Sequence, residues 1–136
     1  MTQVEKEVAR LLRQTWTPPK ALPETGIDLL LVKAYKTAAE LQLHARRLDR
    51  QHGEAVEPET QPLIDRRLDM LDFILTTPAN GLRSAQVKLR VLLDPRAGLA
   101  AGRGIHDITA IKQVSMVISR EMDQRRRARA ERRAKP

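Results

Sequence analysis

The sequence contains no cysteine, few aromatic residues and no long apolar run, and each absence excludes a class of structure or function. Without cysteine the chain cannot form a disulfide framework, which favours an intracellular location. Aromatic residues make up 2% of the chain, so a sheet or barrel that stacks the bases of single strands is not expected. The longest apolar run, residues 29–32, is far short of the roughly 20 residues of a membrane span. We therefore expect a soluble, cytoplasmic protein.

The sequence also lacks a recognisable catalytic or metal-binding pattern. No HExxH or Cys/His spacing accompanies the three histidines, His44, His52 and His106. The glycine-rich segment 96–104 precedes a predicted helix, as phosphate-binding loops do, but it lacks the Lys-Ser/Thr pair of a P-loop. We interpret this segment as a surface connection. Accordingly we expect no enzyme activity, no cofactor, no bound metal and no small-molecule substrate.

Apolar residues recur at helical spacing along most of the chain, which predicts an all-α bundle of about four core helices. The first and longest core helix should run from a capping box of Thr25 and Asp28 to His52, with Gly53 as a left-handed stop. Its apolar seam keeps spacings of four and three residues, and its alanines allow a partner helix to approach closely. The predicted seam comprises Ile27, Leu31, Ala34, Ala38, Leu41, Ala45, Leu48 and His52.

Three further core helices are expected. The second should begin near Pro58 or Pro62 and end near Leu75, and the short connection favours an antiparallel hairpin with the first. The third should follow Thr77 as its N-cap, and the last should begin near Ile105. The predicted seams are Ile64, Leu68, Leu71 and Leu75; then Leu82, Ala85, Leu89 and Leu92; and finally Ile105, Ile108, Ile111, Val114, Val117, Ile118 and Met122.

A separate amphipathic helix is predicted over residues 3–14, before a linker that contains three prolines. The predicted organisation is therefore an N-terminal helical arm with its linker (1–24), a helical bundle (25–122) and a basic tail (123–136). We expect the arm to dock outside the intramolecular core, on a neighbouring copy, which would give a homo-oligomer. In the competing arrangement the arm covers its own bundle, with Trp16 as an internal plug.

The segment 71–93, LDFILTTPANGLRSAQVKLRVLL, has two interpretations. As a helix-turn-helix, residues 79–92 would form the reading helix, and the alternative is an ordinary helical corner. The residues offered to bases and phosphates would be Asn80, Arg83, Gln86, Lys88 and Arg90. An Ile-x-x-Thr-Pro-Ala element followed by a Gly and a Lys occupies Ile74, Thr77, Pro78, Ala79, Gly81 and Lys88. Over residues 74–88 the chain resembles small helical proteins of unknown function in alphaproteobacterial genomes and prophages, a resemblance that implies no known activity.

The last seventeen residues carry most of the charge. Residues 120–136 hold eight Lys or Arg and three Asp or Glu, a surplus of +5 out of +8 for the whole chain. Such a cationic helical extension indicates a polyanionic partner, nucleic acid or an acidic protein surface. The candidate nucleic-acid-binding residues are Arg120, Arg125, Arg126, Arg127, Arg129, Arg132, Arg133 and Lys135. We expect a non-enzymatic binding protein. The alternative is a structural or assembly adaptor, for example a bacteriophage particle component, that uses the arm and the long helix for subunit contacts.

Overall fold

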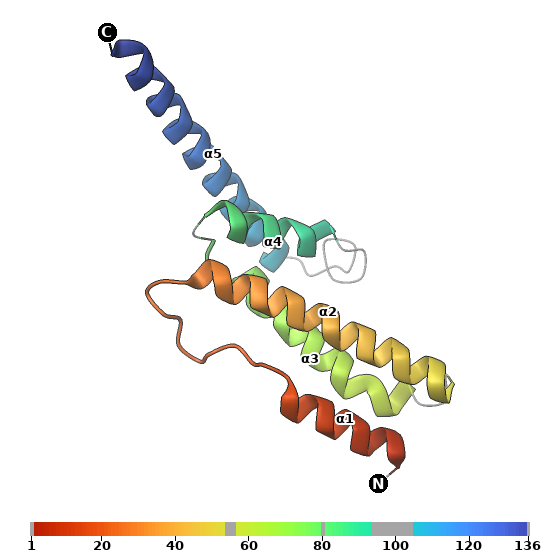
Figure 1. The fold of residues 1–136 in the computed structure, drawn as a ribbon. Helices are drawn as coiled ribbons and strands as arrows, with labels where there is room; N and C mark the ends of the chain where they lie inside the picture. The colour runs from red at the N-terminus through yellow and green to blue at the C-terminus, as the bar shows by residue number, and fades with distance from the viewer. Residues whose placement is uncertain (1, 54–56, 80, 94–104, 136) are drawn as a thin grey trace. The chain divides into compact units, whose positions relative to one another are not determined.

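The computed structural model describes residues 2–53, 57–79, 81–93 and 105–135 (Figure 1). Over these residues the regular structure is entirely helical, which confirms the predicted all-α fold. The helices are α1 (Gln3–Gln14), α2 (Ile27–His52), α3 (Glu57–Thr76), α4 (Leu82–Leu93) and α5 (Ile105–Ala134). Among the described residues, no helix is both long enough and apolar enough to cross a lipid bilayer.

The chain divides into two compact units, Met1–Ile74 and Leu75–Pro136. The boundary lies in the last turn of α3, inside the segment 25–122 that the sequence predicts as one bundle. Charge divides at the same point. The first unit has 11 Lys or Arg and 12 Asp or Glu, whereas the second has 14 and 5, so their formal charges are −1 and +9. All of the net positive charge of the chain therefore belongs to the second unit.

Helix α2 buries the seam that the sequence predicts. Six successive seam residues are at most 4% exposed: Leu31, Ala34, Ala38, Leu41, Ala45 and Leu48. The first and last positions of the predicted seam are less buried, since Ile27 is half-buried and His52 is exposed. Leu29 and Leu43, which lie beside the seam, are both more than half exposed. Only one stripe of α2 is therefore covered.

Both ends of α2 use a glycine. Gly26 is the N-cap, with φ 80° and ψ 16°, and no side chain caps the helix, so the predicted capping box of Thr25 and Asp28 is wrong. This left-handed conformation costs a glycine little because it has no Cβ. At the other end Gly53 has φ 82° and ψ 171°, and its N–H donates to the carbonyl of Asp49 at 2.8 Å. The positive φ is as predicted, but ψ lies outside the left-handed helical region.

Helices α2 and α3 form the predicted antiparallel hairpin (Figure 1). The Thr60 hydroxyl, in the first turns of α3, donates to Asp49 Oδ1 near the end of α2 at 3.3 Å. The buried stripe of α3 differs from the predicted seam, because Ile64 and Leu68 are only half-buried. The stripe runs instead through Thr60, Leu63, Arg67, Met70 and Ile74, joined by Leu71 and Leu75. Because Thr60 and Arg67 are polar, a search for apolar residues at helical spacing does not identify this stripe.

Helix α1 docks within its own unit, which is the competing arrangement of the arm. Val4, Val8 and Leu11 are buried in the single chain. At its N-terminus, the hydroxyl of Thr2 accepts from the backbone N–H of Glu5 and donates to Glu59 Oε2 at 2.7 Å. The twelve-residue connection between α1 and α2 makes this return possible, since an extended chain spans about 3.3 Å per residue.

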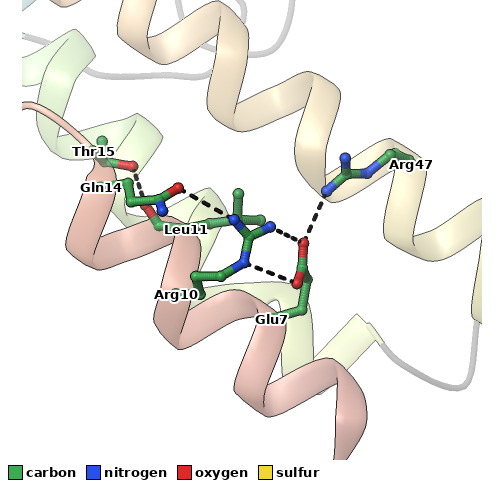
Figure 2. Close-up of polar contacts among 6 residues, drawn as sticks. All are labelled: Glu7, Arg10, Leu11, Gln14, Thr15 and Arg47. Atoms are coloured by element: carbon green, nitrogen blue, oxygen red, sulfur yellow. Dashed lines mark hydrogen bonds and ion pairs between the residues drawn. The ribbon is translucent and has the colours of Figure 1, made fainter.

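A charged cluster also joins α1 to α2 (Figure 2). Glu7 accepts from Arg10 at 2.5 and 3.2 Å and lies 3.4 Å from a guanidinium nitrogen of Arg47 on α2. The hydrogen bond from Arg10 is the largest cause that holds the pKa of Glu7 below its usual value, and Arg47 adds to it. Trp16 is half-buried, and the Lys33 ammonium lies 5.3 Å from its ring centroid, so Trp16 forms a cation–π contact rather than an internal plug.

In the second unit α4 packs against α5. Ala85 of α4 clusters with Val114 and Val117 of α5, and Ala79 packs against this cluster. The predicted third seam is only half right: Ala85 and Leu92 are buried, whereas Leu82 and Leu89 are 41% and 38% exposed. The residues of α4 that are buried are Ser84, Ala85, Val87, Lys88, Val91 and Leu92.

The buried stripe of α5 is also narrower than predicted. Ala110, Val114 and Val117 are buried, whereas Ile111, Ile118 and Met122 are 39–50% exposed. The side chains of Ile105 and Ile108 lie outside those the structure describes. Beyond Val117 no described side chain of α5 is buried, yet the helix continues to Ala134. Residues 118–134, more than half of α5, therefore form an extension without a buried side chain.

Candidate nucleic-acid interface

The predicted binding residues all lie on this extension. Helix α5 is continuous from Ile105 to Ala134, so the first seven of them share one helix and Lys135 follows its last residue. Each is exposed: Arg120, Arg125, Arg126, Arg127, Arg129, Arg132, Arg133 and Lys135. Alanine and arginine are strong helix formers, which explains why helix persists here without a packing face. The extension presents its guanidinium groups to solvent.

Helical geometry divides these arginines between two sides of α5. With 3.6 residues per turn, positions that are one, four, seven and eight residues apart fall on one side. Five arginines meet this condition within an arc of about 120°. They are Arg125, Arg126, Arg129, Arg132 and Arg133, which we call the arginine face. Over residues 118–135 no carboxylate lies within this arc, and the nearest, Glu121, lies at its edge one turn before Arg125.

The opposite side of the extension has mixed charge. Asp123, Arg127 and Glu131 follow one another at intervals of four residues, the spacing at which helical side chains are neighbours. Arg120 and Arg127 line a hollow of about 810 Å³ on this side, together with Pro78 and Ala79 of the turn before α4. The structure therefore separates Arg120 and Arg127 from the five residues of the arginine face.

The helix-turn-helix interpretation is not supported by the second unit. Helix α4 begins at Leu82, three residues after the predicted start of the reading helix, so Thr77 is not its N-cap. Thr77 is itself buried. Lys88, proposed to contact nucleic acid, is fully buried, whereas Arg83, Gln86 and Arg90 are exposed. Asn80 lies outside the described residues.

Sequence reasoning missed the role of Lys88. Its ammonium group is fully buried and donates to the carbonyl oxygen of Leu75 at 3.2 Å. Because α3 ends at Thr76, this carbonyl is among the last four of the helix, which have no partner within it. A cation is also favoured there by the helix dipole. Lys88 thus provides a hydrogen-bond partner for the C-terminal end of α3. Its helical spacing could have indicated its burial, because Lys88 lies four residues after Ser84 and three before Val91, which are both buried.

Burial lowers the pKa of Lys88 to about 8 from its ordinary 10.5, because desolvation disfavours the charged form. Between these two pH values the unfolded chain binds more protons than the folded chain. We therefore expect the free energy of unfolding to rise as pH increases from 8 to 10.5, by on the order of 2 kcal/mol. Below pH 8 this contribution should be constant.

The expected pH dependence can be measured by urea unfolding between pH 7 and 10. The variant Lys88→Met should lose the rise, because it has no proton to release. The control is Lys112→Met, which removes an exposed lysine from α5 and should keep the rise. Identical pH profiles for the two variants would show that Lys88 is not the titrating group.

The other sequence candidates do not assemble into a site within the described residues. His44 is half-buried and His52 is exposed, while the side chain of His106 is not among those described. No group of three or more potential metal ligands gathers in the part of the chain that the structure describes. The glycine-rich segment 96–104 lies outside that part. Asp65, Asp69 and Asp72 of α3 are exposed, whereas the neighbouring Arg67 is buried.

The resemblance of residues 74–88 to alphaproteobacterial and prophage proteins stays a prediction. Of its matching positions, Ile74, Thr77 and Lys88 are buried. A comparison of the chain with protein-family models, with curated proteins and with solved structures finds no match.

Proposed function

We propose that this protein binds nucleic acid through the C-terminal extension of α5 and has no catalytic role. The observation that carries the proposal is the separation of charge: −1 in Met1–Ile74 against +9 in Leu75–Pro136, with the excess concentrated on an exposed helix. Guanidinium groups bind phosphates with two parallel hydrogen bonds, and each phosphate that they neutralise releases counterions. Arginine outnumbers lysine by six to one over residues 125–135, which favours such paired contacts.

An electrophoretic mobility shift assay across a salt series tests the proposal. The full chain should bind a DNA duplex at 50 mM salt and weaken steeply as salt rises, by about a thousandfold or more at 200 mM for six phosphate contacts. Binding that does not depend on salt would contradict phosphate contacts. No binding to any nucleic acid at low salt would contradict the proposed function as a whole.

A second candidate, an assembly adaptor, is favoured by a different observation. Leu82 and Leu89 of α4 and Ile118 of α5 are exposed apolar residues that together line a groove of about 450 Å³. Exposed apolar patches of this kind often mark protein partners. The surfaces that the sequence assigned to subunit contacts, α1 and the seam of α2, are buried within the single chain. Leu29 and Leu43 of α2 are also exposed, so a protein partner, including a second copy in the predicted homo-oligomer, would meet either the α4–α5 groove or this side of α2.

A further inference from the structure

We infer that the arginine face recognises double-stranded nucleic acid, with the extension of α5 lying in a major groove and contacting the phosphates of both strands. This inference rests on the proposed function and adds the class of nucleic acid and the residues that select it. It follows from the distribution of the five arginines, from the dimensions of the helix and from the location of the aromatic residues.

The arginine face consists of two rows and a central residue. Arg125 and Arg132 are seven residues apart and form one row along the helix, and Arg126 and Arg133 form the other at the same interval. Seven residues return to nearly the same side of a helix, and one residue turns it by about 100°. The two rows therefore run nearly parallel to the axis and lie about 100° apart around it. Arg129 projects between them.

These dimensions fit a duplex. An α-helix with its side chains is about 10–12 Å across, and the major groove of B-form DNA is about 12 Å wide. With the helix in the groove, each row faces one of the two flanking phosphate backbones, and Arg129 faces the groove floor. From Arg125 to Arg133 the helix rises about 12 Å, over which a duplex presents about seven phosphate charges. A single strand could meet only one row at a time.

The second unit has no Phe, Tyr or Trp on which unstacked bases could stack. The three aromatic residues of the chain, Trp16, Tyr35 and Phe73, all belong to Met1–Ile74. Proteins that hold single strands combine basic grooves with aromatic side chains on which bases stack. The unit that carries the positive charge has no such side chain, which favours contacts with the backbone and with the edges of paired bases.

Three double variants with the same spacing and the same loss of charge test the inference. Arg125→Ala/Arg132→Ala removes one row, Arg126→Ala/Arg133→Ala removes the other, and Arg120→Ala/Arg127→Ala removes two arginines from the opposite side. Each pair is seven residues apart and lowers the formal net charge from +8 to +6. Alanine is the best helix former, so circular dichroism should show an intact helix in all three.

On a 20-base-pair DNA duplex in 0.1 M salt, each row variant should bind about 10- to 100-fold more weakly, and its slope of log K against log salt should fall by about 2. The opposite-side variant should bind within about twofold of the full chain. A single strand of the same sequence should bind the unaltered chain at least about tenfold more weakly than the duplex.

Three outcomes overturn the inference while leaving the proposed function standing. Equal losses in all three variants would mean that the tail acts as an undirected polycation. A loss in only one row variant would mean that a single phosphate backbone is contacted. Tighter binding of the single strand would exclude recognition of a duplex. By contrast, both the proposed function and the inference would be overturned if the unaltered chain bound poly-glutamate but bound neither the DNA duplex nor the single strand.

Discussion

A chain that ends at Gln124 should retain its fold and lose at least about a hundredfold in affinity for duplex DNA at low salt. The removed segment holds seven Arg or Lys and one Glu, so the formal net charge falls from +8 to +2. Stability should change little, because no described side chain after Val117 in α5 is buried. A mobility shift assay and a thermal melt of the two chains measure both effects.

The loss of affinity must be separated from the loss of helix. A full-length variant with the five arginines of the arginine face replaced by glutamine keeps the length of α5 and removes five charges. It should bind as poorly as the truncated chain, within a few-fold. Unchanged affinity of the truncated chain at low salt would locate binding outside the extension, for which the exposed Arg83 and Arg90 of α4 are the next candidates.

Replacement of Leu41 by alanine should have the largest effect on stability, a loss of about 2–5 kcal/mol in the free energy of unfolding. Leu41 is 1% exposed at the middle of the α2 seam, so its truncation removes buried apolar area and leaves a cavity. Leu43, two residues further along the same helix, is 61% exposed and provides the matched control. Leu43→Ala should cost about 0.5 kcal/mol or less.

Urea unfolding of the two variants at pH 7 gives both values. Similar losses at Leu41 and Leu43 would mean that both sides of α2 are covered in solution. In that case a second copy or another partner would bind the side that is exposed in the single chain. The pair therefore also probes the predicted homo-oligomer without requiring a measurement of mass.

The sequence predicted α2 well and α3 and α4 less well, for a physical reason. In α2 every interior seam position is aliphatic, so spacing alone identifies the buried stripe. In α3 and α4 the stripe includes Thr60, Arg67, Ser84 and Lys88, whose burial depends on interactions that the sequence does not specify. A search for large apolar residues therefore selected Leu68 and Leu89 instead, which are half-buried and exposed respectively.

The candidate interface was predicted in composition but not in arrangement. The surplus of arginine over residues 120–136 is visible in the sequence, as is the persistence of helix-forming residues. The arginines fall on two sides of α5 only if the helix continues unbroken from its packed part to Ala134. The structure shows that it does. The position of Arg120 and Arg127 beside Pro78 and Ala79 could not be predicted, because it depends on how α5 packs in the second unit.

The burial of Lys88 gives the second unit a built-in chemical reporter. The six other lysines of the chain are exposed, whereas Lys88 is fully buried. An amine-directed acetylating reagent can therefore reach Lys88 only when α4 opens, just as amide hydrogens exchange through transient opening. The ratio of acetylation at Lys88 to that at Lys112 then measures how often this part of the molecule opens, with the exposed lysine as internal standard. A nucleic acid that bound the extension and stabilised the packing of α5 against α4 would slow the acetylation of Lys88 and leave that of Lys112 unchanged.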